Sequence, residues 1–232
     1  MTIRQITLVA TLGLVGMVWA VQAQQRFDPF QVQLDMFAGF GGNEERFQRA
    51  MTATETELAA NPNNAAALVW HGMGVALLSE REFQKGNLQG ALAQLQKGMA
   101  EMARAAELEP DNIGVRIPRG SALKEMSRNM PPEMAAPILE TARTDFQRAF
   151  DLQQARLDEV PTPHPLGELL QGLGDIYSRQ GKADEAAKYY AMIEQRLPGT
   201  EYARRAAEWA QTRQPLPQAK AQCIGCHTVT KR

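Results

Sequence analysis

Turn-forming residues divide most of this chain into helix-length segments. Between the turns, from Asn43 onward, Ala, Leu, Glu, Gln, Arg and Met dominate, and these residues favour helices. No stretch alternates apolar and polar residues with the β-branched enrichment typical of strands. The spacing of the turns therefore predicts an all-α chain of antiparallel helix pairs. The turn signals are Asn61-Pro62-Asn63-Asn64, Glu109-Pro110-Asp111-Asn112, Pro131-Pro132, Pro161-Thr162-Pro163, Gly181 and Pro198-Gly199.

The clearest predicted helix pair covers residues 167–199. Its first helix carries the small residue Gly174 near Tyr177, and its second helix carries Ala186 near Tyr190. Small residues allow two helices to approach closely, while the tyrosines fill the space on either side. Pro198 prevents the second helix from continuing. In its length of roughly 34 residues and in its small and large positions, the unit resembles a tetratricopeptide repeat.

Weaker copies of the same pattern lie upstream. Trp70, Met73, Gly74 and Leu77 reproduce the first-helix pattern, and their partner helix is predicted near residues 91–107. That partner lies about twelve residues late for this repeat class, which predicts an inserted or elongated turn around residues 83–90. A third copy carries Gly120 and Leu123 in its first helix, followed by Ala142, Phe146 and Ala149 in its second.

The resemblance covers residues 43–213 and implies a solenoid of about three repeats. Residues 45–60 are predicted to form an unpaired second helix, and residues 201–213 a capping helix. Repeats of this kind stack into a right-handed superhelix whose concave face usually binds an extended peptide or a partner helix. The alternative for the same residues is an irregular helical bundle.

The first 23 residues have the layout of a secretory signal peptide. Arg4 precedes an apolar run over residues 6–20, and small residues at 21–23 form a cleavage site. The run is shorter than the roughly 20 residues of a membrane span, and no later stretch is apolar enough to cross. We therefore expect an exported, periplasmic protein with no membrane span after cleavage. An uncleaved N-terminal anchor is the alternative.

Residues 24–42 have no clear period and are predicted to be an irregular segment. They are rich in Phe, Gly and Gln, and their aromatic side chains are expected to pack on the first helices. The alternative is an aromatic arm that docks a partner or covers a cofactor. The net charge of the whole chain is −1, so nothing favours binding to nucleic acid.

The C-terminal tail, residues 214–232, carries the sequence Cys223-Ile224-Gly225-Cys226-His227. Cys-x-x-Cys-His is the attachment signature of c-type haem. The thiols of Cys223 and Cys226 form thioethers with the two vinyl groups, and the imidazole of His227 is the proximal iron ligand. The segment resembles the haem-binding segment of c-type cytochromes, which implies one covalent haem c. The predicted export of the protein agrees with a covalent haem, because haem is attached to such motifs outside the bacterial cytoplasm.

Three other interpretations of the motif remain open. A thioredoxin-like redox pair requires a βαβ context, which the sequence does not show. A zinc site requires four ligands, and no second ligand cluster accompanies these three residues. A structural disulfide between Cys223 and Cys226 is the third alternative, because an exported protein with one cysteine pair can form one.

The distal iron ligand must come from outside the tail, because only five residues follow His227. His71 follows Trp70 at a position that tends to face the concave groove in the resembling family. His164 lies in a proline-rich linker at a helix start. Met126, Met130 and Met134 are spaced by four, although Pro131 and Pro132 interrupt them. The remaining alternatives are a ligand from a second copy of the chain and an iron without a distal ligand.

Two functional hypotheses follow. The first is a mono-haem c-type cytochrome on a repeat scaffold, an electron carrier rather than an enzyme, with a redox partner protein or peptide docked in the groove. The second is an interaction or assembly scaffold whose tail haem is structural or joins subunits into a homo-oligomer. A haem-maturation helper is a third, weaker alternative. No motif for substrate-processing chemistry is present in the sequence.

Overall fold

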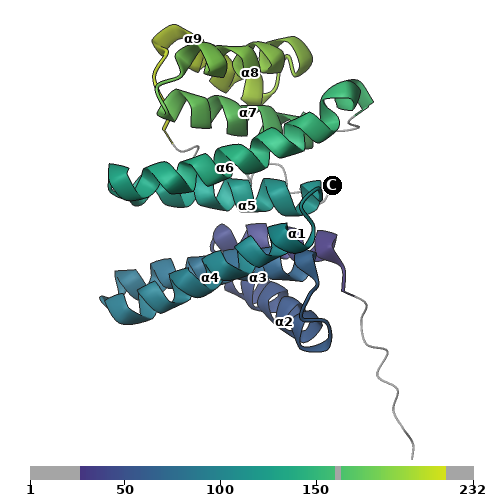
Figure 1. The fold of residues 1–232 in the computed structure, drawn as a ribbon, viewed down its shortest axis with the longest axis vertical. Helices are drawn as coiled ribbons and strands as arrows, with labels where there is room; N and C mark the ends of the chain where they lie inside the picture. Colours follow the sequence, from purple (N-terminus) through teal and green to yellow (C-terminus); the bar gives the residue numbers. More distant parts are fainter. Residues whose placement is uncertain (1–26, 160–162, 218–232) are drawn as a thin grey trace, which may run out of the picture.

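A computed structural model describes residues 27–159 and 163–217, and those residues form helices without strands (Figure 1). The prediction of an all-α fold is confirmed. The α-helices are α1 (Pro29–Phe40), α2 (Glu44–Ala60), α3 (Ala65–Gln84), α4 (Leu88–Leu108), α5 (Ile113–Met126), α6 (Pro132–Gln153), α7 (Pro163–Arg179), α8 (Ala183–Arg196) and α9 (Glu201–Thr212), with 3₁₀ turns η1 (Ser127–Asn129) and η2 (Gln154–Glu159).

The helices pair in chain order and the pairs stack along the long axis of the molecule (Figure 1). Helix α1 packs on α2, α3 on α4, α5 on α6 and α7 on α8, while α9 covers α8 and touches α7. The first helices of successive pairs also contact one another, so α1, α3, α5, α7 and α9 form one continuous row. This arrangement confirms the predicted solenoid of antiparallel helix pairs, which is tetratricopeptide-like in its organisation.

The N-terminal segment departs from the prediction. Residues 24–42 were expected to be irregular, but residues 29–40 form α1. Asp28 is the N-cap of this helix, and its side chain accepts hydrogen bonds from the amides of Phe30 and Gln31. Met36 is fully buried in the core. Helix α2 is therefore not an unpaired second helix. It completes an additional pair, which the Gly- and Phe-rich composition of α1 concealed.

In the second pair, α3 and α4, the additional residues lie elsewhere than predicted. An inserted or elongated turn was expected around residues 83–90, but the two helices are joined by the short turn from Lys85 to Asn87. The additional residues instead lengthen the helices themselves, to 20 residues in α3 and 21 in α4. The turn is closed by the side chain of Asn87, which accepts a hydrogen bond from the amide of Gly90.

Close helix contact depends on small residues, as the pattern predicted. The ring of Tyr190 lies over Gly174, where an added Cβ would be 2.9 Å from the ring. In the longest pair the contact is between backbones. A Cβ on Gly72 would lie 2.7 Å from the carbonyl oxygen of Gly98, and a Cβ on Gly98 would lie 2.6 Å from that of Gly72. Any larger residue at either position must separate α3 from α4.

A buried polar contact joins the two helices of every pair. In three pairs the acceptor is an aspartate with little or no exposure, and in the second pair the acceptor is a glutamate paired with a buried histidine. Burial of a carboxylate is unfavourable unless it is paired and hydrogen-bonded, so each contact fixes the register of its helix pair. The contacts are Asp35 with Arg46 and Arg49, His71 with Glu101, Asp145 with Arg116 and Arg119, and Asp175 with Tyr190.

Substitution of Gly98 by Ala tests the backbone contact between α3 and α4. We expect Gly98→Ala to lower the free energy of unfolding by about 1–3 kcal/mol, because the added methyl group meets a carbonyl that cannot rotate away. Gly114→Ala is the control, because the only neighbour of its new Cβ is the Asn112 side chain at 3.1 Å. Urea unfolding of both variants is the measurement. Equal stability of the two would contradict the close contact.

Candidate functional site

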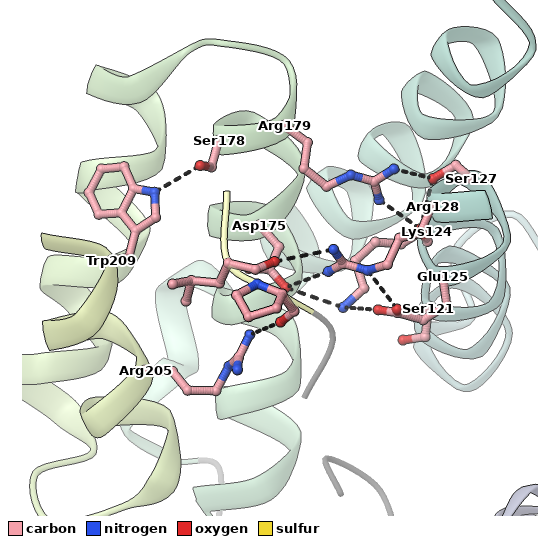
Figure 2. A network of polar contacts seen from close by, with 12 residues as sticks. Ser121, Lys124, Glu125, Ser127, Arg128, Asp175, Ser178, Arg179, Arg205 and Trp209 are labelled. Carbon is pink, nitrogen blue, oxygen red and sulfur yellow. Dashed lines mark hydrogen bonds and ion pairs between the residues drawn. The ribbon is translucent and has the colours of Figure 1, made fainter. Parts of the chain in front are cut away.

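The segment that follows α9 folds back over α7 and is held there by a buried polar cluster (Figure 2). The side chain of Arg128 donates from Nη1 to the carbonyl oxygen of Leu216 at 3.2 Å. Arg205 donates from Nη2 to the carbonyl oxygen of Pro217 at 2.9 Å. The Leu216 side chain is itself buried. The backbone that leads into the C-terminal tail is therefore fixed on the row of first helices.

Asp175 of α7 is the acidic centre of this cluster. Its carboxylate accepts a hydrogen bond from the Tyr190 hydroxyl at 2.7 Å, and its Oδ2 lies 3.5 Å from Nη2 of Arg128 and 3.8 Å from Nζ of Lys124. We call Lys124, Glu125, Arg128, Asp175 and Arg205 the tail clamp. Its residues come from α5, η1, α7 and α9, so the clamp assembles only when the last pairs have stacked.

Further hydrogen bonds hold the clamp rigid. Arg179 donates to the carbonyl oxygen of Lys124 at 2.7 Å and to Oγ of Ser127 at 2.8 Å, which ties α7 to the end of α5. On the other side of α7, the indole of Trp209 donates to Oγ of Ser178 at 2.8 Å, which ties α9 to α7 (Figure 2). The two guanidinium groups of the clamp are thus presented on fixed helices.

The electrostatics of the clamp favour its charged form. Burial opposes the charge of Lys124, but Glu125 and Asp175 outweigh burial and raise the pKa of the Lys124 ammonium. Burial likewise opposes the charge of Glu125, while Lys124 and Arg128 outweigh it and lower the pKa of that carboxyl. Burial and the adjacent Asp175 raise the pKa of the Tyr190 hydroxyl, which stays protonated and donates.

A polar stripe runs along α7 from the clamp to the helix start. His164, Glu168, Gln171 and Asp175 are spaced by four, three and four residues, which places them on one face of a helix. Glu168 accepts from the Ser121 hydroxyl of α5 at 2.8 Å. Gln171 is 2% exposed, and its Oε1 has no hydrogen-bond partner among the described residues.

His164, at the N-terminal end of the stripe, is half-buried against α9. Its Nδ1 is 2.9 Å from the hydroxyl of Tyr202. The Tyr202 ring occupies the space above Gly167, where an added Cβ would be 2.4 Å from the ring. Tyr202 and Arg205 are three residues apart on α9 and both are buried, so the His164 contact and the Pro217 contact lie on the same face of that helix.

His71 occupies a different part of the molecule. Its Nδ1 donates to Oε2 of Glu101 at 2.6 Å, and its Nε2 lies 3.7 Å from Oε1 of Glu55. Those carboxylates belong to α4 and α2, which are second helices. His71 therefore points away from the row of first helices, and the expectation that it faces the groove is wrong. Helix α5 separates α3 from α7, so the structure does not bring His71 and His164 together.

The three methionines do not form a common face. Met126 ends α5 and packs against the core, Met130 follows η1, and Met134 begins α6 with 55% of its surface exposed. The proline pair between Met130 and Met134 starts a new helix, as the sequence indicated.

Cys223, Cys226 and His227 lie outside the described residues, as does the signal segment 1–23. Within residues 27–159 and 163–217, no group of three or more His, Cys, Asp or Glu side chains is arranged to hold a metal ion. In the same ranges, every helix is too short or too polar to cross a membrane.

The clamp was not anticipated from the sequence, although a signal for it existed. Arg205 interrupts the apolar face that Tyr202, Ala206 and Trp209 give to α9, and Asp175 lies among the apolar residues of α7. A charge on an otherwise apolar face predicts a buried partner. The partner itself could not be predicted, because it is the backbone of a proline-flanked segment after the last helix.

Comparison with known proteins does not assign this chain to a family. No protein-family model matches the chain, and no curated protein matches it. Among solved structures, the chain is similar to a thermophilic TPR protein of Thermus thermophilus, with 16% sequence identity and a TM-score of 0.35. The match covers 78% of this chain and 98% of that one. The helix-pair architecture described above is established by the contacts within this chain.

Adjacent arginines on α9 provide a matched test of the clamp. Arg205→Met removes the donor to Pro217, whereas Arg204→Met removes only exposed ion pairs, with Glu201 and Glu208. We expect trypsin to cleave after Arg213 about fivefold faster in Arg205→Met, since a hydrogen bond from a charged group contributes at least about 1 kcal/mol. Global stability should change little, because Met also relieves the burial of a charge. Equal cleavage of the two variants would contradict the clamp.

The clamp also predicts a pH dependence. The pKa of Glu125 is lowered in the folded protein. The ionised carboxylate therefore contributes to stability above pH 4.5, its ordinary pKa, and this contribution is lost as the pH falls through the pKa of the folded protein. Lys124 has a raised pKa, so its contribution is present below 10.5 and is lost at higher pH. The urea midpoint of Glu125→Gln should therefore depend less on pH below about 4.5 than that of the unmodified chain. An identical decrease of the urea midpoint at acid pH in the two proteins would show that Glu125 makes no net contribution to stability.

Proposed function

We propose that this chain is an exported electron-transfer protein that carries one c-type haem on its tail and uses its helix pairs to dock a redox partner. The fold itself is that of a protein-interaction scaffold, because stacked helix pairs present an extended surface rather than a closed catalytic cleft. The observation that supports the finer proposal is the fixed position of Leu216 and Pro217, which precede the haem-attachment motif by only a few residues.

The length of the tail limits where the motif can lie. Cys223 is six residues beyond Pro217, and a fully extended chain of six residues spans about 20 Å. The attachment site therefore lies within about 20 Å of Pro217. A tail joined to the scaffold by a much longer linker would not have this property. Confinement favours electron transfer, because a docked partner then meets the redox group at a reproducible place.

The donor set of the motif fits the proposed group. Cys223 and Cys226 supply two thiols for thioether bonds, and His227 supplies an imidazole for the iron. One-electron transfer is the chemistry that such a group provides when it is bound. The residues of the clamp have a positioning role, in which Arg128 and Arg205 hold the backbone that leads to the motif.

An interaction or assembly scaffold is the second candidate function. It is favoured by large apolar side chains that are exposed where α3 and α4 meet, at the end of the longest pair. Phe83, Leu88 and Leu92 are each more than half exposed there, and Leu88 and Leu92 lie one turn apart on the same face of α4. In this case the tail haem is structural, or it joins copies of the chain.

Covalent attachment is tested on protein produced together with haem-maturation machinery. We expect the intact mass to increase by one haem, with a pyridine haemochrome spectrum of the c type, and Cys223→Ala/Cys226→Ala to lose both. A chain made under these conditions without haem would contradict the proposal.

Electron transfer and the scaffold role are then separated by two measurements on the holoprotein. Reversible reduction by a small cytochrome supports the first. An oligomer that dissociates in Cys223→Ala/Cys226→Ala, without redox exchange, supports the second.

A further inference from the structure

We propose that the tail clamp is a binding site for an extended peptide segment of a partner protein, in which an apolar side chain is followed by an acidic one. Residues 214–217 of this chain occupy the site as a removable strap. The proposal rests on the docking role in the proposed function, whose partner chemistry it names, but not on the haem. It is supported by the way in which the strap is held, by a free donor of Arg205 and by the conformation of Arg213.

The strap is held in the way that a peptide ligand is held. Its two hydrogen bonds to the clamp arginines are accepted by the backbone carbonyl oxygens of Leu216 and Pro217, which any residue type possesses. The Leu216 side chain is 4% exposed, whereas residues 213–215 and Pro217 are exposed. Extended peptides are commonly recognised by main-chain hydrogen bonds together with burial of selected side chains. Another chain with an apolar residue at this place would make the same contacts.

The strap satisfies only part of the buried guanidinium of Arg205, which reaches it from α9 (Figure 2). Nη2 donates to the carbonyl oxygen of Pro217, but Nε, on the same edge of the group, is buried without a hydrogen-bond partner among the described residues. Elsewhere in this molecule the same edge binds a carboxylate: Arg119 donates to Asp145 from Nε at 2.6 Å and from Nη2 at 2.8 Å. A carboxylate offers two oxygen atoms to such a fork, whereas a carbonyl group offers one. A peptide with an acidic side chain beside Arg205 would therefore use a donor that the strap leaves free.

The charges around the strap also favour an acidic ligand. Burial, and then the positive charge of Arg128, lower the pKa of the Arg179 guanidinium, against the opposing effect of Glu125 and Asp175. Four cationic side chains meet three carboxylates here, which leaves one positive charge in excess. The cations are Lys124, Arg128, Arg179 and Arg205, and the carboxylates are Glu125, Glu168 and Asp175. One acidic side chain balances this excess, whereas a basic side chain increases it.

The turn that leads into the strap is strained. Arg213 has a φ of 55° and is the only non-glycine residue with a positive φ in the part of the chain that the structure describes. This left-handed conformation is unfavourable for a residue with a side chain unless the surroundings hold it. The Arg213 guanidinium lies 4.9 Å from the centre of the Trp209 ring, and its Nη2 is 3.1 Å from Oδ1 of Asp184. Ion pairs with an exposed partner are weak, so release of the strap relieves the turn and sacrifices little at its outer side.

The strap competes with a partner because it is attached beside the site. Only two residues lie between Arg213 and Leu216, and a segment tethered so closely has an effective concentration on the order of millimolar. A partner at a lower concentration displaces it only by making a contact that the strap lacks, and the free donor of Arg205 provides one. Displacement leaves the strap attached to α9 through Arg213, so the chain that follows stays at this end of the molecule.

The test is peptide binding to the full chain, measured by fluorescence anisotropy. Three labelled peptides with amidated C-termini carry Gln-Pro-Leu-Asp, Gln-Pro-Leu-Pro or Gln-Pro-Leu-Lys between glycine and serine residues. Leu216→Gly weakens the strap, and Gln214→Gly is the matched control because Gln214 is exposed. We expect Leu216→Gly to bind the acidic peptide at least about tenfold more tightly than Gln214→Gly does, since burial of a leucine side chain changes an equilibrium constant by about that factor or more. The neutral and basic peptides should follow in that order.

The role of Arg205 is tested with the strap weakened. In Leu216→Gly/Arg205→Met the acidic and neutral peptides should bind equally, whereas in Leu216→Gly/Arg204→Met the acidic peptide should keep an advantage of about tenfold, as expected for a charged hydrogen bond. Circular dichroism checks that each variant is folded. Leu216→Ala should give the same order of affinities with a smaller increase, and it replaces Leu216→Gly if that variant does not fold.

Three results would overturn the inference. A folded Leu216→Gly chain that binds the acidic peptide no more tightly than Gln214→Gly would show that Leu216 belongs to the core and not to a removable strap. Equal binding of the three peptides to Leu216→Gly would remove the case for an acidic partner. A dimer of the unmodified chain that dissociates in Leu216→Gly would show that the occupant is the segment of a second copy. None of these measurements needs haem, so the intact mass of the holoprotein decides the proposed electron-transfer function separately.

Discussion

The C-terminal half of this protein depends on the contacts that the buried carboxylate of Asp175 makes with its neighbours. This carboxylate binds Tyr190 of its own helix pair, and it lies beside Arg128 and Lys124 of the preceding pair. The same carboxylate therefore serves two purposes: it holds α7 on α8, and it orients the guanidinium that holds Leu216. A buried charge with several partners is specific in position because few other arrangements satisfy it. The position of Leu216 is in this way a consequence of the core.

The other helix pairs show that Asp175 is one member of a series. Asp35 and Asp145 join their pairs through arginines, and His71 joins its pair through Glu101. At Asp35, burial would raise the pKa, but the hydrogen bonds from Arg49 and Arg46 outweigh burial and hold the pKa of that carboxyl below its ordinary value. Within this series, His71 has a structural role. Asp175 differs because part of its cluster binds a backbone segment rather than only a neighbouring helix.

Much of the fold could be predicted from the sequence, and the reasons are local. Gly174 and Tyr190 indicate a close helix contact, and the proline and asparagine turns mark the helix ends. Helix α1 was missed because its glycines and phenylalanines have no clear period, although Asp28 followed by Pro29 is a helix-start signal. The clamp was beyond prediction, since it joins residues 128 and 205 to carbonyl oxygens that any residue type would possess. The motif at Cys223 was recognisable, but the position of Leu216 and Pro217, which precede it, depends on that clamp.

The central claim is that the scaffold determines where the tail places its redox group. The most direct measurement is the position of iron in a crystal of the holoprotein, located by anomalous scattering at the iron edge. We predict an iron atom within the reach of the tail, near the end of the molecule formed by α5, α7 and α9. An iron atom beside α1, α2 or α3, or a chain that carries no iron, would contradict this.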